Sequence, residues 1–120
     1  MAEPADPRDW DVIATLRLID LLAGRWVLAI VRELHGADRL RRRHLRGALP
    51  GVSDKVLTET LRRLEEHGLV NRYAIASVPV EVDYALTELA ATLVPVITTL
   101  HRWAADHPFD TGPSPTSEDP

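Results

Sequence analysis

The sequence contains no cysteine, and this absence removes several classes of chemistry at once. Disulfide bridges, cysteine-ligated metals, thiol nucleophiles and thiol-based redox sensors all need a residue type that these 120 residues lack. A chain without cysteine also suits a reducing compartment, and we expect a cytoplasmic protein.

Long apolar runs and catalytic motifs are missing too. No stretch reaches about 18 apolar residues without a charge, so we expect no membrane-spanning helix. The first nine residues are acidic and lack a hydrophobic segment, so a secretion signal is not expected. Glycine-rich phosphate loops and zinc motifs are absent, and the candidate acids and bases are scattered along the chain. We therefore expect no enzyme, no bound metal and no cofactor.

The net charge of −4 conceals a basic middle region. Residues 1–11 sum to −3 and residues 106–120 to −4, which leaves +3 for residues 12–105. A local basic patch matters more to a polyanion than the whole-chain charge, because salt screens charges beyond about 8–10 Å. A solvated arginine-rich loop is the alternative reading of this patch. Its members are Arg39, Arg41, Arg42, Arg43 and Arg46.

Composition and length fit one domain with a single core, since 45% of the 120 residues are hydrophobic. Residues 1–10, with two prolines, are expected to form a flexible arm. Residues 108–120 are rich in proline, serine, threonine and acid, and we expect them to be disordered. The folded domain should therefore span residues 11–107.

Residues 43–72 carry the pattern of two helices joined by a tight turn. Proline followed by glycine at Pro50-Gly51 ends the first segment. Ser53 is a typical first residue of the next helix, because its hydroxyl can accept a backbone N–H, and Gly68 is placed to end it. One face of this second helix, about residues 53–67, should be buried through Leu57, Leu61 and Leu64. This pattern predicts a helix-turn-helix.

Alternating apolar residues follow this motif, on both sides of a connection at about residues 77–80. They predict a β-hairpin over about residues 70–86, which would be the wing of a winged helix domain. Further helices are expected over about residues 11–22 and 25–35, the latter apolar on nearly all sides, with a short strand near Leu40. The fold class predicted is mainly α with a small β-hairpin wing, flanked by N- and C-terminal dimerisation helices.

The last helix, over about residues 87–106, is expected to be more apolar than one core can cover. Pro95 lies inside it, so we expect a kink or the loss of one backbone hydrogen bond. The first helix should carry its apolar residues on a buried side, and these could meet the last helix of a second copy. We therefore expect an obligate homodimer. Its interface would contain Val12, Leu16, Ile19, Leu93, Val96, Ile97, Leu100 and Trp103.

The order of these motifs resembles that of HxlR-type regulators, which are winged helix-turn-helix proteins related to the MarR group. The matching segments are GRWVLAIVREL at 24–34, LPGVSDKVLT at 49–58, LRRLEEHGLV at 61–70, Val78-Pro79 and YALTEL at 84–89. This resemblance covers about residues 12–105. It implies a small bacterial transcriptional regulator that binds operator DNA as a homodimer. The first and last helices would form the contact between the two copies. The second helix of the motif would enter the major groove, with the wing near the adjacent minor groove.

The resemblance and the polar face of the second motif helix together give the candidate DNA contacts. Arg62 is the best candidate to read a base, because a guanidinium can donate to both O6 and N7 of guanine, whereas Lys55 suits phosphate. Ser53 is a helix cap first, and a phosphate contact would go through its backbone N–H. Glu59 could accept from a cytosine amine or pair with a neighbouring arginine. The full set is Arg42, Arg43, Arg46, Ser53, Lys55, Thr58, Glu59, Arg62 and Arg72.

The sequence departs from the family pattern in three respects. The cysteine that usually precedes the first helix is absent, so thiol sensing cannot be transferred to this chain. Arg42 stands where the family commonly has an aromatic residue. Val80 and Glu81 stand in the wing where a basic residue is common, so wing contact should be weaker or come from Arg72 and its neighbours.

Two questions stay open at this stage. A winged helix can also serve protein–protein contact, since a fold alone does not fix function. Sensing, without cysteine, would have to use a small-molecule effector in a pocket at the dimer interface, a partner protein, or nothing at all.

Overall fold

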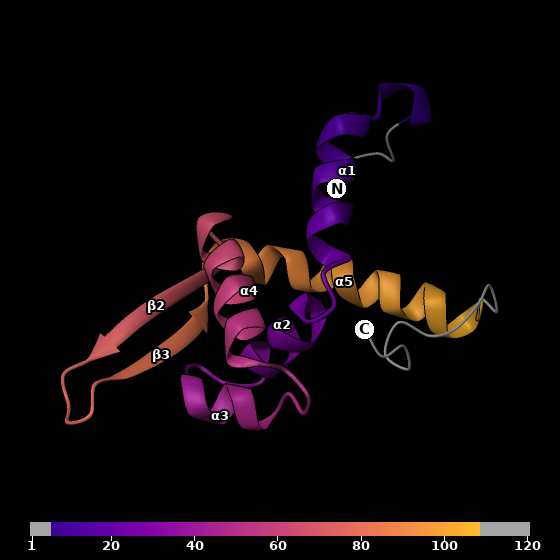
Figure 1. Ribbon diagram of the computed structural model, residues 1–120. Helices are drawn as coiled ribbons and strands as arrows, with labels where there is room; N and C mark the ends of the chain where they lie inside the picture. Colours follow the sequence, from indigo (N-terminus) through magenta and orange to yellow (C-terminus); the bar gives the residue numbers. More distant parts are fainter. Residues whose placement is uncertain (1–5, 109–120) are drawn as a thin grey trace.

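Five helices and a three-stranded sheet make up the part of the chain that the computed structural model describes, residues 6–108. The helices are α1 (Val12–Leu22), α2 (Val27–His35), α3 (Arg42–Gly47), α4 (Asp54–Glu66) and α5 (Glu88–Asp106), preceded by the short 3-10 helix η1 (Pro7–Asp9). The strands β1 (Leu40–Arg41), β2 (Val70–Ile75) and β3 (Glu81–Leu86) form an antiparallel sheet in the order β1-β3-β2 (Figure 1). The predicted mainly α fold with a hairpin wing is confirmed.

The two ends of the chain lie partly outside this description. The flexible arm expected over residues 1–10 is described only from residue 6, where η1 forms. Asp6 accepts hydrogen bonds from the Arg8 guanidinium, which lower the pKa of this carboxyl below its ordinary value. Residues 109–120, most of the tail expected to be disordered, lie outside the described residues. No helix between residues 6 and 108 is long and apolar enough to cross a membrane.

The core forms where α2, α3 and α4 meet the sheet. The three leucines predicted for the inner face of α4 are fully buried, at 1% exposure or less, and α2 contributes four buried residues. Although α2 is apolar on nearly all sides, as expected, only one of its faces is buried. Leu28 is 45% exposed, because α2 packs one face against α3 and the sheet and leaves the other uncovered.

The ends of α4 follow the predicted capping chemistry. Ser53 Oγ accepts the N–H of Val56 at 3.1 Å, which satisfies one of the unpaired donors of the first turn. At the other end Gly68 has φ of +72°, a left-handed conformation that glycine adopts at little cost. The Leu69 N–H then reaches back to the Leu64 carbonyl at 2.9 Å, and the chain turns into β2.

Thr87 connects the end of α4 to the start of α5. Its hydroxyl accepts the N–H of Ala90 and donates to the carbonyl of Gly68 at 2.7 Å, while its own N–H donates to Leu69 at 3.1 Å. The last helix is unbroken through Pro95, whose nitrogen has no hydrogen to donate, so one backbone bond is lost as expected.

The first helix differs from its expectation. Val12, Leu16 and Ile19 were expected on a buried side, but within one chain they are 58%, 50% and 52% exposed. Only Leu21 of α1 is buried, because the helix projects from the body of the molecule instead of lying against it (Figure 1). Much of α5 is also uncovered, with Leu100 and Trp103 both more than half exposed.

A glycine pair tests the geometry that ends α4. We expect Gly68→Ala to lower the free energy of unfolding by about 1–2 kcal/mol, because a Cβ is disfavoured at this φ although it would meet nothing closer than 3.8 Å. Gly47→Ala is the matched control, since its Cβ would have no neighbour within 4 Å. It should leave stability unchanged or raise it by up to about 1 kcal/mol. Urea titrations measure both, and equal effects would contradict the role given to Gly68.

Candidate nucleic-acid interface

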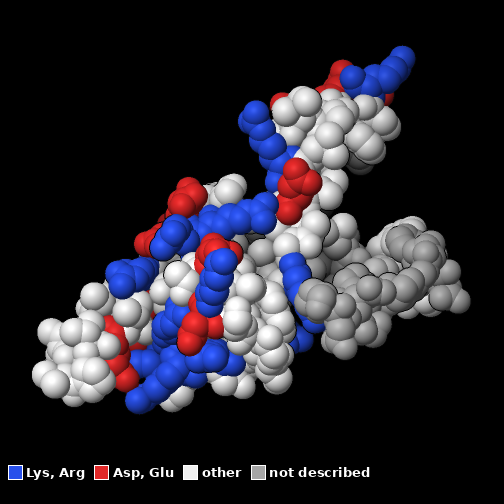
Figure 2. Space-filling view, viewed as in Figure 1, with Lys and Arg blue, Asp and Glu red and all other residues white. Residues whose placement is uncertain are grey.

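The candidate interface comprises α3, the outer face of α4 and the β2–β3 hairpin. Figure 2 shows lysine and arginine side chains gathered over α3 and α4, with carboxylates placed among them. The end of the hairpin is uncharged in the same view. The surface is therefore a mixed one, and its chemistry depends on which cations are already paired.

Every arginine of the predicted basic patch has a carboxylate partner. Three acidic residues, Asp54, Glu81 and Asp83, supply these partners. The ion pairs are Arg39–Asp83 at 3.2 Å, Arg41–Asp83 at 3.0 Å, Arg41–Glu81, Arg42–Asp54 at 3.5 Å, Arg43–Glu81 at 3.0 Å and Arg46–Asp54 at 2.9 Å. Partly exposed pairs of this kind contribute little to stability. Their main consequence is that a phosphate must compete with a carboxylate for each arginine.

Arg42 joins the two helices of the motif. Its Nη2 donates to the Thr58 hydroxyl at 3.0 Å and to the Asp54 carbonyl at 3.3 Å, so the first residue of α3 holds the first turns of α4. A polar clamp thus stands where the resemblance leads one to expect an aromatic residue. Arg42 and Thr58, both expected at DNA, are occupied by each other.

Lys55, Arg62 and Arg72 are the unpaired cations of the predicted set. All three are exposed, and none forms an ion pair within residues 6–108. Lys55 and Arg62 lie on the outer face of α4, opposite its buried leucines, and Arg72 lies on β2. These three side chains can meet phosphates or base edges without first breaking an internal contact.

Glu59 is also exposed on α4 and makes no ion pair in the described part of the chain. The alternative, an ion pair between Glu59 and the neighbouring Arg62 or Arg63, is not formed. Arg63 turns instead toward α1, where its Nη2 donates to the Asp20 carbonyl at 3.4 Å. Glu59 therefore keeps both carboxylate oxygens available to accept from a base amine.

The wing has an apolar end, and the acidic residue beside this end is paired with arginines. Val78 is fully exposed and Val80 is 70% exposed, and no residue from 73 to 80 carries a charge. Glu81, expected to repel phosphate from the wing, is the first residue of β3, directly after the connection between the strands, and is paired with Arg41 and Arg43. Its charge is thus largely neutralised within the protein, and the sequence did not indicate this because the partners lie some forty residues apart.

The described residues offer no sign of a metal centre. Between residues 6 and 108 no group of three or more histidine, aspartate or glutamate side chains is arranged to hold a metal ion.

Comparisons with known proteins agree on one family. Residues 21–110 match the family model described as HxlR-like helix-turn-helix. An HTH-type transcriptional regulator of Synechocystis sp. is 39% identical over 89 residues, which are 74% of this chain and 65% of that protein. The regulator YvaP of Bacillus subtilis is 36% identical over 91 residues, covering 75% of this chain and 82% of the relative.

The solved structures give the same picture at lower identity. The reduced form of the transcriptional regulator YodB from B. subtilis superposes with a TM-score of 0.72 at 27% identity, over 92% of this chain and all of that one. The segment that matches the Synechocystis regulator spans just under two thirds of that regulator's length. These relatives are named as transcriptional regulators, which speaks against the enzyme alternative.

Neutralising Asp54 tests the competition between carboxylate and phosphate. Asp54→Asn should raise the affinity for random-sequence duplex DNA about fivefold at low salt, since one unit charge near 4 Å in water is worth about 1 kcal/mol. Asp38→Asn is the control, because Asp38 is also exposed but makes no ion pair with any residue from 6 to 108. Fluorescence anisotropy measures binding and thermal melting verifies the fold. Equal affinities for both variants would mean that Asp54 does not restrain Arg46.

Proposed function

The chain belongs to the HxlR-like helix-turn-helix family, and we propose that it binds double-stranded operator DNA as a homodimer and so regulates transcription in the bacterial cytoplasm. In this proposal α4 enters the major groove and the β2–β3 hairpin lies near the adjacent minor groove. The observation that carries it is the outer face of α4, where unpaired cations and Glu59 stand beside an exposed hairpin.

The shape of α4 supports the groove assignment. Its 13 residues make a rod of about 20 Å, and the major groove of B-DNA, about 12 Å wide, admits one helix. Arg62 can donate to guanine O6 and N7, Glu59 can accept from a cytosine amine, and Lys55 suits a phosphate. The hydroxyl of Ser53 is used as a helix cap, so any phosphate contact there goes through backbone N–H groups.

The uncovered faces of α1 and α5 support the dimer. Apolar side chains of both helices are about half exposed within one chain. Contact between water and so many apolar side chains is unfavourable, and covering them with a second copy would remove this contact. Leu93 and Ile97 pack partly on the core, while Val96, Leu100 and Trp103 are about half exposed. Two copies related by a two-fold axis would read half-sites about one helical turn of DNA apart.

A small-molecule effector, left open by the sequence, would have a place near this surface. A hollow of about 370 Å³ lies between α1 and the first half of α5, with Leu21, Leu93 and Val96 among its lining. Its walls are mainly apolar, so it would suit an apolar compound.

Protein–protein contact by the wing is the second candidate function. The uncharged end of the hairpin, with exposed Val78 and Val80, favours it, whereas the unpaired cations of α4 favour DNA. Salt dependence distinguishes the two, because only phosphate contacts release counterions in proportion to their number.

Two alanine variants test the DNA proposal. Lys55→Ala should weaken binding to all duplexes alike and reduce the slope of log K against log salt by about 0.9, as expected for one phosphate contact. Arg62→Ala should cost about 1–3 kcal/mol on the preferred sequence and relax preference at one base pair of each half-site. The control is Arg102→Ala on α5, which is also exposed and forms no ion pair with another described residue. If all three variants bind like the wild type, α4 is not the reading helix.

The dimer proposal is tested by a charge placed on the uncovered face of α5. Leu100→Glu should give a monomer at micromolar concentration, because a carboxylate at the centre of an apolar interface loses its solvation. Thr99→Glu adds the same charge to the neighbouring exposed position of the same helix and should remain a dimer. Sedimentation equilibrium measures both. A monomeric wild type, or a dimeric Leu100→Glu, would refute this arrangement.

A further inference from the structure

A hollow beside α4 contains an arginine that is not among the DNA contacts predicted from the sequence. The hollow measures about 250 Å³ and lies between the start of α2 and one flank of α4, and we call it the α2–α4 hollow. Gly24, Arg25, Trp26 and Val27 line it from the α2 side, and Val56, Glu59, Thr60 and Arg63 line it from α4. The proposed reading helix thus borders a surface that the helix-turn-helix motif does not include.

The hollow and α3 lie on opposite flanks of α4. Asp54 and Thr58 contact arginine side chains of α3. Val56 and Arg63 line the hollow and lie about half a turn away around the helix axis, since an α-helix repeats every 3.6 residues. The major groove of B-DNA is bounded by two sugar-phosphate strands, so a helix that lies in it has one strand beside each flank. The α2–α4 hollow would therefore face the strand that α3 does not reach.

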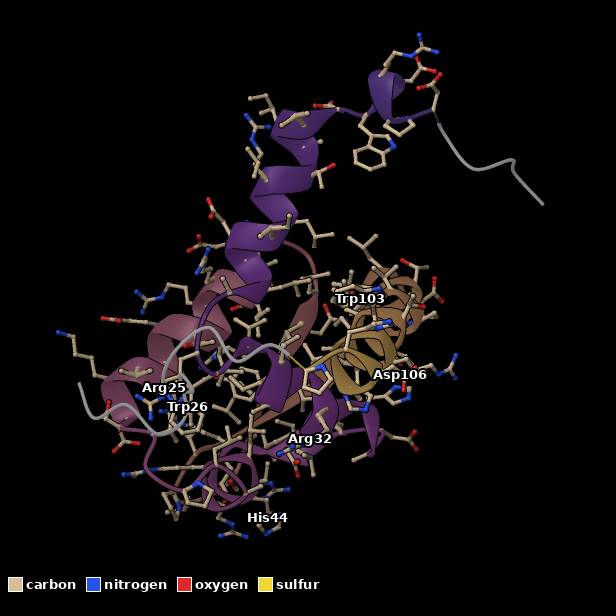
Figure 3. The ribbon with its side chains drawn as sticks, turned by 90° about the vertical axis from the view of Figure 1, so that its right-hand side faces the viewer. Arg25, Trp26, Arg32, His44, Trp103 and Asp106 are labelled. Carbon is tan, nitrogen blue, oxygen red and sulfur yellow. The ribbon has the colours of Figure 1, made fainter. Side chains whose placement is uncertain are left out.

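Arg25 is the cation of this hollow that has no acidic partner. Its side chain is exposed, and its guanidinium forms no ion pair or hydrogen bond with any residue from 6 to 108. The guanidinium carbon lies 5.5 Å from the centre of the Trp26 ring, a contact that restricts the side chain without neutralising its charge. Figure 3 shows Arg25 and Trp26 beside α4, whereas Arg32 of the same helix lies away from it.

The rest of the lining adds one more cation and one carboxylate. Arg63 uses Nη2 to donate to the Asp20 carbonyl at 3.4 Å. A Cβ added to Gly24 would lie 3.6 Å from Nη1 of Arg63, so the missing side chain leaves this second nitrogen open. Glu59 is the one carboxylate among the described residues that line the hollow, and two guanidinium groups outnumber it. The net charge of the lining is therefore positive.

A comparison of the two flanks leads to the inference. Arg42 and Arg46, on the α3 flank, both pair with Asp54, so a phosphate must compete for them. We propose that a backbone phosphate of DNA binds in the α2–α4 hollow, with Arg25 as its main contact and Arg63 beside it. Phosphate contacts fix the register and orientation of a protein on the duplex. This inference rests on the proposed DNA binding and adds a contact from outside the helix-turn-helix.

The salt dependence of binding to a random-sequence duplex tests this contact. Arg25→Ala should reduce the slope of log K against log salt by about 0.9, as expected for the loss of one phosphate contact. Arg25→Lys should keep most of the slope, because a phosphate is also bound by a point charge. The matched control is Arg32→Ala, which removes the same charge from an exposed position of the same helix and should leave the slope unchanged. Fluorescence anisotropy measures binding, and thermal melting verifies that each variant is folded.

The absence of cysteine allows the contact to be located on the DNA, because an introduced thiol is the only one present. An iron chelate coupled to Ala23→Cys, at an exposed position next to the hollow, should cleave the backbone of a duplex selected from a random pool by the wild-type protein. A chelate on Gly47→Cys, at the exposed end of α3, should cleave the strand on the other side of the major groove. The control chelate on Thr99→Cys of α5 should cleave neither strand.

The outcomes separate this inference from the proposal beneath it. Duplex binding by the wild type that does not weaken with salt would refute the DNA proposal and the phosphate contact together. A slope that falls in Lys55→Ala but not in Arg25→Ala would refute the phosphate contact alone. Cleavage by the Gly47→Cys chelate without cleavage by the Ala23→Cys chelate would refute it as well, because the start of α2 would then lie away from the DNA.

Discussion

Burial of one face of α4 is the interaction on which the rest of this structure depends. Three leucines, Leu57, Leu61 and Leu64, are fully enclosed by α2, α3 and the sheet. Replacing one such leucine by alanine typically costs about 2–5 kcal/mol, a large part of the stability of a small domain. Because an α-helix repeats every 3.6 residues, this burial also determines which side chains face outward. Lys55, Glu59 and Arg62 owe their exposure to the leucines behind them.

The charged surface is then divided by a second constraint, the placement of three carboxylates. Asp54, Glu81 and Asp83 engage all five arginines that a reading of the sequence assigns to a basic patch. Arg42 in particular is better understood as a brace between α3 and α4 than as a free cation. A polyanion would thus meet a surface whose attraction is reduced by these carboxylates, and the unpaired positive charges of this surface lie on the outer face of α4 and on β2.

Periodicity and capping rules predicted the elements well, because they act over distances of a few residues. Ser53, Gly68 and Thr87 each end or begin a helix for reasons visible in the local sequence. The ion pairs were not predicted, since Arg41 and Asp83 meet only when β1 pairs with β3. The exposure of α1 was missed for another reason. An apolar stripe on a helix shows which side must be covered, but not whether the same chain or a second one covers it.

Thr87 connects the segment that ends α4 with the start of α5. Its hydroxyl donates to the Gly68 carbonyl and its N–H donates to the Leu69 carbonyl, so the segment that ends α4 is held to the start of α5. If α5 packs against a second copy, as proposed, that packing would also set the direction and the spacing of the two α4 helices. This chain contains no cysteine, so a thiol cannot alter such packing. In the proposed dimer, the exposed apolar side chains of α1 and α5 would carry the contact instead.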